Sequence, residues 1–228
     1  MTRSVEDCRE TLHSLRSQTL RPEIVVTVGE PVKGLVTGEV VGRTMNEALS
    51  RIQVSDYDFL LKSDDDILYP PRFLEVNTQA DYDAMGRGAG LLVRVEAYLK
   101  YIKEWDTTSL EDSYPFYALL INNRRVLINN WVLPAKLLKP STEPSDFTRM
   151  WACGRDCYRI GFPFEVYAVS QLVLAGRCSG VRAKAAQLWA IVGYVSACVR
   201  RLEKSPIAGR WCSYQRMHYH RRILRRLS

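Results

Sequence analysis

The chain has 228 residues, of which 46% are hydrophobic and 25% charged, which suffices for one α/β domain of ordinary size with a small appendage. This composition excludes a disordered or low-complexity chain. The formal net charge of +7 is uneven, because residues 200–228 hold nine Lys and Arg against one Glu, a net of +8, and the rest sums to −1. Such a basic tail favours binding to phosphate, either of nucleic acid or of an anionic membrane.

The termini and cysteines favour a cytoplasmic protein. The first 15 residues contain no apolar core of the kind found in signal peptides, so secretion is not expected. Six cysteines are scattered along the chain, and only Cys153 and Cys157 lie close in sequence. No second pair completes a zinc site, so free thiols in a reducing compartment are expected.

Hydrophobic periodicity predicts alternating strands and helices up to residue 134. The β-branched run at residues 24–28 is typical of a strand buried on both faces of a parallel sheet. The first elements expected are a helix at 5–17 with Cys8, Leu12 and Leu15 on its apolar face, a strand at 24–28, a helix at 44–52 capped by Thr44 with Glu47, and a strand at 57–61. A short helix opened by Pro70-Pro71 follows, and then segments 82–85 and 90–95 around a glycine-rich turn. The last are a helix to about Trp105, a helix at 113–122 stopped by Asn122-Asn123, and a strand at 125–132. This alternation predicts a mostly parallel sheet with helices on both faces.

The character of the sequence changes after residue 134. Residues 136–146 are rich in Pro and Ser, and we place the domain boundary there, with domains at 1–134 and 135–228. Two apolar stretches follow, at 166–176 and 185–199, and both are shorter than the ~20 residues that span a bilayer. We expect interfacial or core helices in a basic C-terminal appendage.

Three consecutive aspartates, Asp64, Asp65 and Asp66, follow the strand expected at 57–61. Ligands of parallel α/β sheets bind at the carboxyl ends of strands. Adjacent carboxylates repel one another unless a cation neutralises them, and Mn²⁺ or Mg²⁺ held by one or two carboxylates and a substrate phosphate meets that need. A solvated acidic turn is the alternative. A second acidic pair, Glu111-Asp112, precedes the helix at 113–122, where Asp112 can cap the helix or act as a general base.

In this order, the motifs resemble an inverting glycosyltransferase of family 2, which has the GT-A fold. The resemblance covers roughly residues 2–134 and is carried by EDCRETLHSLRSQTLRPEIVVTV, GRTMNEAL, FLLKSDDDILYPPRFLE, GAGLLVRVEAY and LEDSYPFYALLINNRRVLINNWV. It implies a Rossmann-like sheet, a nucleotide-diphosphate sugar as donor, and an acceptor hydroxyl on a glycan, a lipid-linked molecule or a protein.

The resemblance also implies roles for individual residues. Asp66 would ligate the metal, Asp64 would touch the metal or the ribose, and Asp112 would deprotonate the acceptor. The further residues expected near the nucleotide are Asp65, Arg43, Asn46, Glu30 and Arg3.

The chain departs from the family pattern at three places. The apolar strand that opens the family is expected to be missing or truncated, because residues 1–4 stand where it should already have ended. Glu30 stands near the place of the aspartate that reads the base. Asn123 replaces the usual glycine after the catalytic helix, and Asn tolerates a positive φ.

Residues after 150 resemble the tails of membrane-associated family 2 enzymes. Apolar helices followed by clustered Arg and by Trp211, Tyr214 and Tyr219 suit a bilayer interface. We therefore expect a metal-dependent transferase that lies peripherally on the cytoplasmic face of the cell membrane and binds anionic lipid through residues 166–228.

Three alternatives remain open. A nucleotidyltransferase would share the acidic site, but a glycine-rich loop with Lys or Arg near the N-terminus is absent from the sequence. A nucleic-acid-binding protein would use the basic tail, but it would leave the aspartates without a role. A transferase-like protein that has lost its activity would be consistent with the missing first strand.

Overall fold

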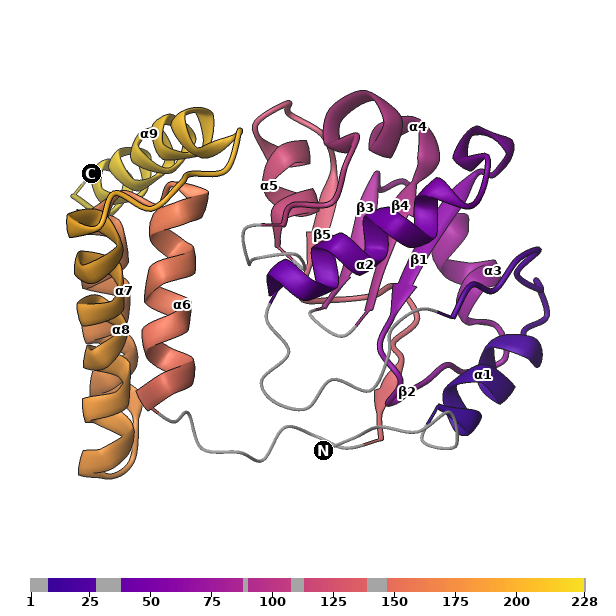
Figure 1. Cartoon of the computed structure of the whole chain (residues 1–228), viewed down its shortest axis with the longest axis horizontal. Helices are drawn as coiled ribbons and strands as arrows, with labels where there is room; N and C mark the ends of the chain where they lie inside the picture. The colour runs from indigo at the N-terminus through magenta and orange to yellow at the C-terminus, as the bar shows by residue number, and fades with distance from the viewer. Residues whose placement is uncertain (1–7, 28–37, 88–89, 108–112, 139–146, 228) are drawn as a thin grey trace. The chain divides into compact units, whose positions relative to one another are not determined.

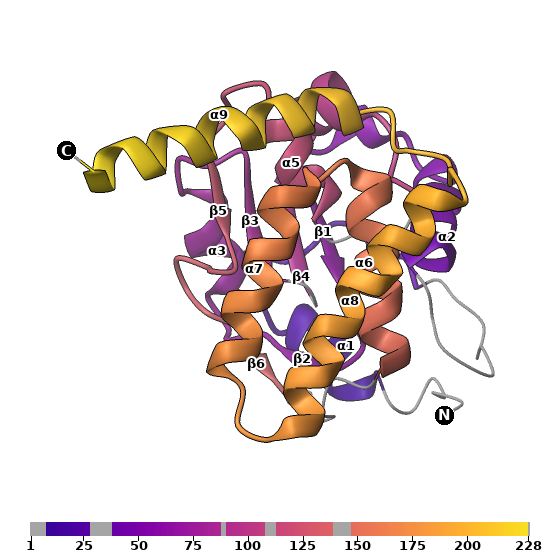
Figure 2. The same ribbon diagram turned by 90° about the vertical axis from the view of Figure 1, so that its left-hand side faces the viewer.

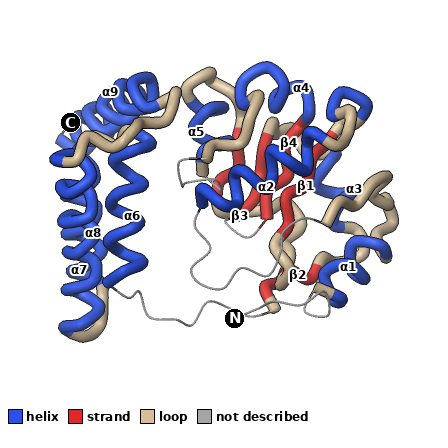
Figure 3. Tube along the Cα trace, in the orientation of Figure 1, coloured by secondary structure: helices blue, strands red, loops and turns tan. Residues whose placement is uncertain are grey.

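The computed structural model describes residues 8–27, 38–87, 90–107, 113–138 and 147–227, and the chain divides into two compact units (Figure 1). The first consists of residues 1–107 and 111–140, and the second of residues 108–110 and 141–228. Strands and helices alternate in the described part of the first unit, whereas the second is built from helices (Figure 3). The α/β class expected for the first unit is therefore confirmed.

Four strands of the first unit form one mixed sheet. Their order is β1 (Phe59–Ser63), β4 (Gly90–Arg94), β3 (Ala84–Arg87) and β5 (Val126–Ile128). β4 pairs antiparallel with both β1 and β3, and only β3 and β5 are parallel. The expectation of a mostly parallel sheet is thus wrong for the described strands. The physical reason is that only residues 88–89 separate β3 from β4, which is too short for the crossover that parallel neighbours need.

Helices cover both faces of this sheet, as expected. Helix α2 (Gly38–Ser50) lies on one face and α3 (Phe73–Thr78) on the other (Figures 1 and 2). Because α2 begins at Gly38, Thr44 lies inside the helix, and the capping box predicted at Thr44 is wrong. Gly42 lets α2 lie close to the backbone at Asp106, since a Cβ at residue 42 would lie 2.2 Å from the carbonyl oxygen of Asp106.

The remaining elements of the first unit are short. They are α1 (Arg9–Arg16), a 3-10 turn (Val54–Asp56), β2 (Ile67–Leu68), α4 (Val95–Ala97), a π-helical turn (Tyr98–Ile102), α5 (Tyr114–Leu120) and β6 (Lys136–Leu137). Asn123, after α5, has a φ of 55°, which confirms the left-handed stop predicted there. β6 pairs with β2, so the first unit continues beyond residue 134, where the sequence placed its end.

The strand expected at residues 24–28 is absent from its described part, residues 24–27. Ile24, Val25 and Val26 are 47%, 41% and 38% exposed, and no described strand pairs with them. A β-branched run forms a strand only where a neighbour takes its backbone hydrogen bonds. The apolar pattern was therefore insufficient without such a neighbour.

The second unit packs α6 (Phe147–Ile160), α7 (Phe164–Arg177), α8 (Val181–Val199) and α9 (Ala208–Leu227), and the predicted helices at 166–176 and 185–199 are confirmed. Helices α6 and α8 touch through glycines, since a Cβ at Gly154 would lie 1.8 Å from the carbonyl oxygen of Ala190. A Cβ at Gly193 would likewise lie 2.1 Å from the carbonyl oxygen of Trp151. Within the described residues, no helix combines the length and the apolar character needed to cross a membrane.

Asn77 of α3 holds the segment that leads into β6. Its side chain is fully buried and donates hydrogen bonds to the carbonyl oxygens of Phe73 (2.8 Å) and Leu133 (3.0 Å). Its amide oxygen accepts hydrogen bonds from the N–H groups of Val132 (2.9 Å) and Leu133 (3.2 Å). Buried polar groups need such partners, so Asn77 satisfies the backbone at the edge of the core.

We predict that Asn77→Ala lowers the free energy of unfolding by about 2–4 kcal/mol, because it leaves several buried backbone groups without partners. Chemical denaturation of the whole chain measures this loss. Gln79→Ala, at an exposed position next to α3, is the matched control and should change stability by less than about 0.5 kcal/mol. Equal stability of the two variants would contradict the role given to Asn77.

Candidate functional site

The three aspartates form a turn between the end of β1 and the start of β2. All three backbone carbonyls of the turn accept hydrogen bonds: from the Ser63 hydroxyl to Asp64 (2.9 Å), from the Thr11 hydroxyl to Asp65 (2.8 Å) and from the Leu138 N–H to Asp66 (2.8 Å). The three side chains are half-buried. The turn therefore has a fixed backbone and presents carboxylates that keep some access to solvent.

Helix α1 and the residues directly after it add to this support through a row of buried polar side chains. These are Thr11, Ser14 and Gln18, which are 3%, 5% and 3% exposed. The Thr11 hydroxyl donates to the carbonyl of Asp65 and accepts from the N–H of Ile67 (3.2 Å). The Ser14 hydroxyl accepts from the N–H of Tyr69 (3.2 Å). The buried face of α1 thus makes hydrogen bonds directly to the backbone of the residues that follow β1.

Gln18 extends the same row to the start of α3. Its amide nitrogen donates to the carbonyl of Pro70 (2.9 Å), and its amide oxygen accepts from the N–H of Leu74 (3.0 Å). The predicted apolar face of Cys8, Leu12 and Leu15 is therefore wrong in part, because only Leu15 is buried and polar side chains form the rest of the contact. The reason is that backbone N–H and carbonyl groups of residues 65–74 face this segment and need partners, which the polar side chains supply.

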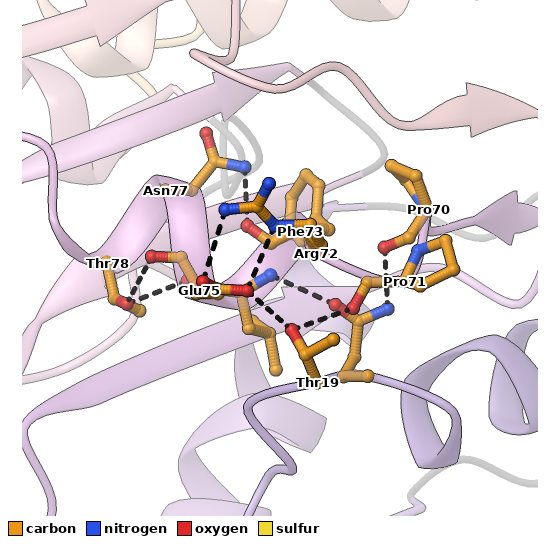
Figure 4. A network of polar contacts seen from close by, with 10 residues as sticks. Thr19, Pro70, Pro71, Arg72, Phe73, Glu75, Asn77 and Thr78 are labelled. Carbon is orange, nitrogen blue, oxygen red and sulfur yellow. Dashed lines mark hydrogen bonds and ion pairs between the residues drawn. The ribbon is translucent and has the colours of Figure 1, made fainter.

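A surface network continues the contact between α1 and α3 (Figure 4). The Thr19 hydroxyl donates to the Glu75 carboxylate (2.8 Å), and Arg72 donates to the same carboxylate through two nitrogens, at 3.1 and 3.2 Å. These hydrogen bonds from Arg72 and Thr19 lower the pKa of Glu75. The Thr19 N–H also donates to the carbonyl of Pro71 (2.8 Å), which fixes the entry to α3.

Lys62 is the charged partner of the acidic turn. It is 6% exposed, and its ammonium lies 3.0 Å from a carboxylate oxygen of Asp64. A buried lysine needs a paired anion, so Asp64 balances this charge and Lys62 relieves part of the repulsion among the three carboxylates. Asp64 thus has a structural partner within the chain, in addition to the ligand role expected of it.

Tyr69 closes the turn from inside the core. Its hydroxyl donates to the hydroxyl of Ser63 (2.8 Å), which in turn donates to Asp64. Burial raises the pKa of Tyr69, and the negative charges of Asp64 and Asp66 raise it further. The phenol therefore remains a neutral donor beside the carboxylates.

The described residues contain no group of three His, Cys, Asp or Glu side chains that converge on one point as metal ligands. A site built from one or two carboxylates and completed by the oxygens of a substrate phosphate does not need such a group, and this is the usual way in which Mg²⁺ is bound with nucleotides. The carboxylates of Asp66 and Asp64 contain hard oxygen donors of that kind. The residues of the turn therefore fit a divalent ion held jointly with a phosphate ligand.

The structure places two other predicted site residues on α2. Arg43 is exposed. The Asn46 amide nitrogen donates to the carbonyl of Trp105 (2.9 Å), and its amide oxygen accepts from the N–H of Trp105 (2.7 Å). These two hydrogen bonds attach α2 to the segment after the π-helical turn, and they give Asn46 a structural function that sequence analysis did not predict.

The other predicted site residues, Arg3, Glu30 and Asp112, lie outside the described residues, as does Glu111. The glycine-rich stretch is described only at its ends. At Gly86, whose φ is 146°, a Cβ would lie 2.2 Å from the carbonyl oxygen of Gly90, so the two backbone segments pack closely at that end.

Sequence analysis missed the residues that hold the acidic turn. Thr11, Ser14 and Gln18 occur at positions i, i+3 and i+7, a helical spacing that indicates a common face. Lys62 lies two residues before Asp64, and a basic residue inside a strand that leads into an acidic run indicates an internal ion pair.

No protein-family model, curated protein or solved structure matches the chain. The assignment of the site therefore rests on the chemistry and geometry of the residues described above.

We predict that Thr11→Val, which keeps the shape of the side chain but removes its hydroxyl, lowers the free energy of unfolding by about 1–3 kcal/mol. The N–H of Ile67 loses its acceptor, so its hydrogen exchange should accelerate about tenfold or more. Thr148→Val, at an exposed position of α6, is the control and should leave both quantities unchanged. If Ile67 exchanges at the same rate in both variants, α1 does not hold the acidic turn.

Proposed function

We propose that the protein is a metal-dependent inverting glycosyltransferase of the GT-A type. It transfers a sugar from a nucleotide-diphosphate donor to an acceptor hydroxyl. The observation that carries this proposal is the acidic turn after β1, in which hydrogen bonds fix the backbone while the carboxylates of Asp65 and Asp66 keep access to solvent. Such an arrangement holds a divalent ion against a diphosphate without reorganising when the ligand binds.

Each residue has a distinct part in this proposal. Asp66 holds the Mn²⁺ or Mg²⁺, and Asp64, balanced by Lys62, orients the nucleotide. When bound, the metal supplies positive charge to the leaving diphosphate. Asp112 takes the proton of the acceptor hydroxyl, because a carboxylate at the acceptor side can act as a general base. The additional nucleotide contacts are assigned to Arg3, Glu30, Arg43, Asn46 and Asp65.

The second unit supports a peripheral position on the cytoplasmic face of the membrane. Small residues of α8 such as Ala186 and Ala190 are fully buried, while large apolar residues of the same helix face outward. Leu188, Val192, Val195 and Val199 follow helical spacing and are 41–77% exposed. Exposed apolar helix faces beside a basic segment of net +8 are typical of a helix that lies in a bilayer interface.

A second candidate is a transferase-like protein that binds nucleotide but has lost sugar transfer. The observation in its favour is that residues 24–27 form no strand, since this run would belong to the nucleotide half of a GT-A sheet. Turnover separates the two candidates. The inactive protein would bind nucleotide with metal and transfer nothing to any acceptor.

We predict that Asp66→Ala abolishes Mn²⁺-dependent binding of nucleoside diphosphate, because the variant lacks the carboxylate placed on the ion. Calorimetric titration with UDP, GDP, ADP and dTDP, each with and without Mn²⁺, measures this loss. Asp56→Ala removes an exposed carboxylate elsewhere in the first unit and should bind as the unaltered protein does. Mn²⁺-dependent affinity that survives in Asp66→Ala would overturn the assignment.

Asp112→Asn is expected to leave nucleotide affinity intact while it slows sugar transfer by about 10²–10⁴-fold, the usual contribution of a general base. The N-cap of α5 is Ser113, so the helix cap expected at Asp112 is wrong. The amide is nearly isosteric with the carboxylate, but it cannot take a proton. Transfer rates and nucleotide affinity are compared for the two proteins. Transfer at the unaltered rate would show that Asp112 is not the general base.

Replacing Arg221, Arg222, Arg225 and Arg226 by Gln should weaken binding to anionic vesicles, since each such charge near the surface contributes about 1 kcal/mol. Substitution is preferable to removal of the whole tail, because Trp211 at the start of α9 is 2% exposed and belongs to the core. Co-sedimentation with phosphatidylserine vesicles at low and high salt is the measurement. The control replaces the exposed residues Arg16, Arg21, Lys100 and Lys103 by Gln. Equal co-sedimentation of both variants would exclude the tail as the anchor, and a shift with RNA in a gel would favour nucleic acid.

A further inference from the structure

A cavity of about 670 Å³ lies within the helical unit. It is found where α9 crosses the end of the bundle at which α6 and α8 end and α7 begins (Figures 1 and 2). Its walls are mainly apolar and include Phe162, Phe164, Tyr194, Val195, Val199 and Ala208. This volume falls within the range of small-molecule sites, and apolar walls indicate that most of the ligand is hydrocarbon.

The cavity opens onto the apolar surface of the helices. Phe164, Val195 and Val199 line it and are at the same time 45%, 44% and 77% exposed. Val195 and Val199 belong to the outward-facing apolar stripe of α8. A hydrocarbon chain can therefore pass from that surface into the cavity without crossing a polar barrier.

Two cationic side chains lie at the rim. The Arg216 Nε is 2.9 Å from a carboxylate oxygen of Glu165, so this pair closes one side with little net charge. The Lys204 ammonium lies 4.7 Å from the ring centroid of Tyr158. Among the described residues, no carboxylate pairs with Lys204. The rim thus offers one cation to a negatively charged head group.

We propose that this cavity binds the hydrocarbon chain of an anionic membrane lipid, with the phosphate of the lipid next to Lys204. An apolar cavity that opens onto an apolar surface and carries a lysine at its rim complements both halves of such a molecule. The site goes beyond sugar transfer and does not depend on it, because every residue that lines it belongs to the second unit.

Two native cysteines make the cavity directly measurable. Cys198 and Cys212 line it, whereas Cys178 and Cys8 do not, and none of the four forms a disulfide. The full chain is alkylated with a maleimide, and each cysteine is followed by peptide mass spectrometry. The probes are oleoyl lysophosphatidic acid below its micelle concentration, its neutral counterpart monooleoylglycerol, and glycerol 3-phosphate, which has the head group alone.

Lysophosphatidic acid at about ten times its Kd should slow alkylation of Cys198 and Cys212 about tenfold, since roughly one cavity in ten then remains empty. Cys178 and Cys8 should react at unchanged rates. Monooleoylglycerol should protect more weakly at the same concentration, and glycerol 3-phosphate should not protect. Unchanged rates at Cys198 and Cys212, or equal protection of all four thiols, would overturn the proposal.

Lys204→Gln tests the head-group contact. The substitution should raise the Kd for lysophosphatidic acid, measured by protection of the cysteines, about two- to fivefold, the range of an exposed ion pair. Protection by monooleoylglycerol should stay unchanged. Lys184→Gln, at an exposed position of α8 outside the cavity, is the matched control. If both variants bind lysophosphatidic acid as tightly as the unaltered protein, the lipid is not held by an anionic head group at Lys204, and the proposal is wrong.

Discussion

The hydrogen bonds from α1 to the chain that follows β1 are the constraint on which the rest of the first unit depends. Thr11 and Ser14 of α1, and Gln18 just after it, satisfy backbone groups between residues 65 and 74, so one segment sets the path of the acidic turn and the start of α3 together. These hydrogen bonds fix the position of the backbone of the turn and do not involve the carboxylate groups. This separation allows the turn to be rigid while its side chains remain available to a ligand.

Charge balance has a second role in the same turn. Lys62 is buried beside Asp64, and one of the three negative charges is therefore compensated by the chain itself. The proposed divalent ion, arriving with a phosphate, would add positive charge to the same acidic turn. In the helical unit, apolar side chains are exposed, and basic residues are concentrated in the last helix and the segment before it. This distribution of charge suits the proposed contact with anionic lipid.

Elements with strong local signals were predictable from the sequence, and those that depend on distant neighbours were not. The left-handed stop at Asn123 follows from a property of asparagine itself, and the apolar stretches of α7 and α8 follow from their composition. Residues 24–27 have the composition of a strand but form none in the structure, because a strand requires a partner that lies elsewhere in the chain. The aspartates of the site were found as a run, whereas the role of Thr11 was not, because its hydrogen-bond partners are more than 50 residues away.

The central claim is that the first unit binds a nucleotide-diphosphate sugar together with a divalent metal, and thermal unfolding of the full chain in the presence of such sugars tests it most directly. The panel includes UDP-, GDP-, ADP- and dTDP-sugars, each with Mn²⁺, with Mg²⁺ and with EDTA. Ligands that bind only the folded state raise its stability, so at about 100 times Kd the true donor should raise Tm by about 5 °C or more, and only with metal. A Tm that no donor changes, or that one donor raises equally with EDTA, would contradict the account.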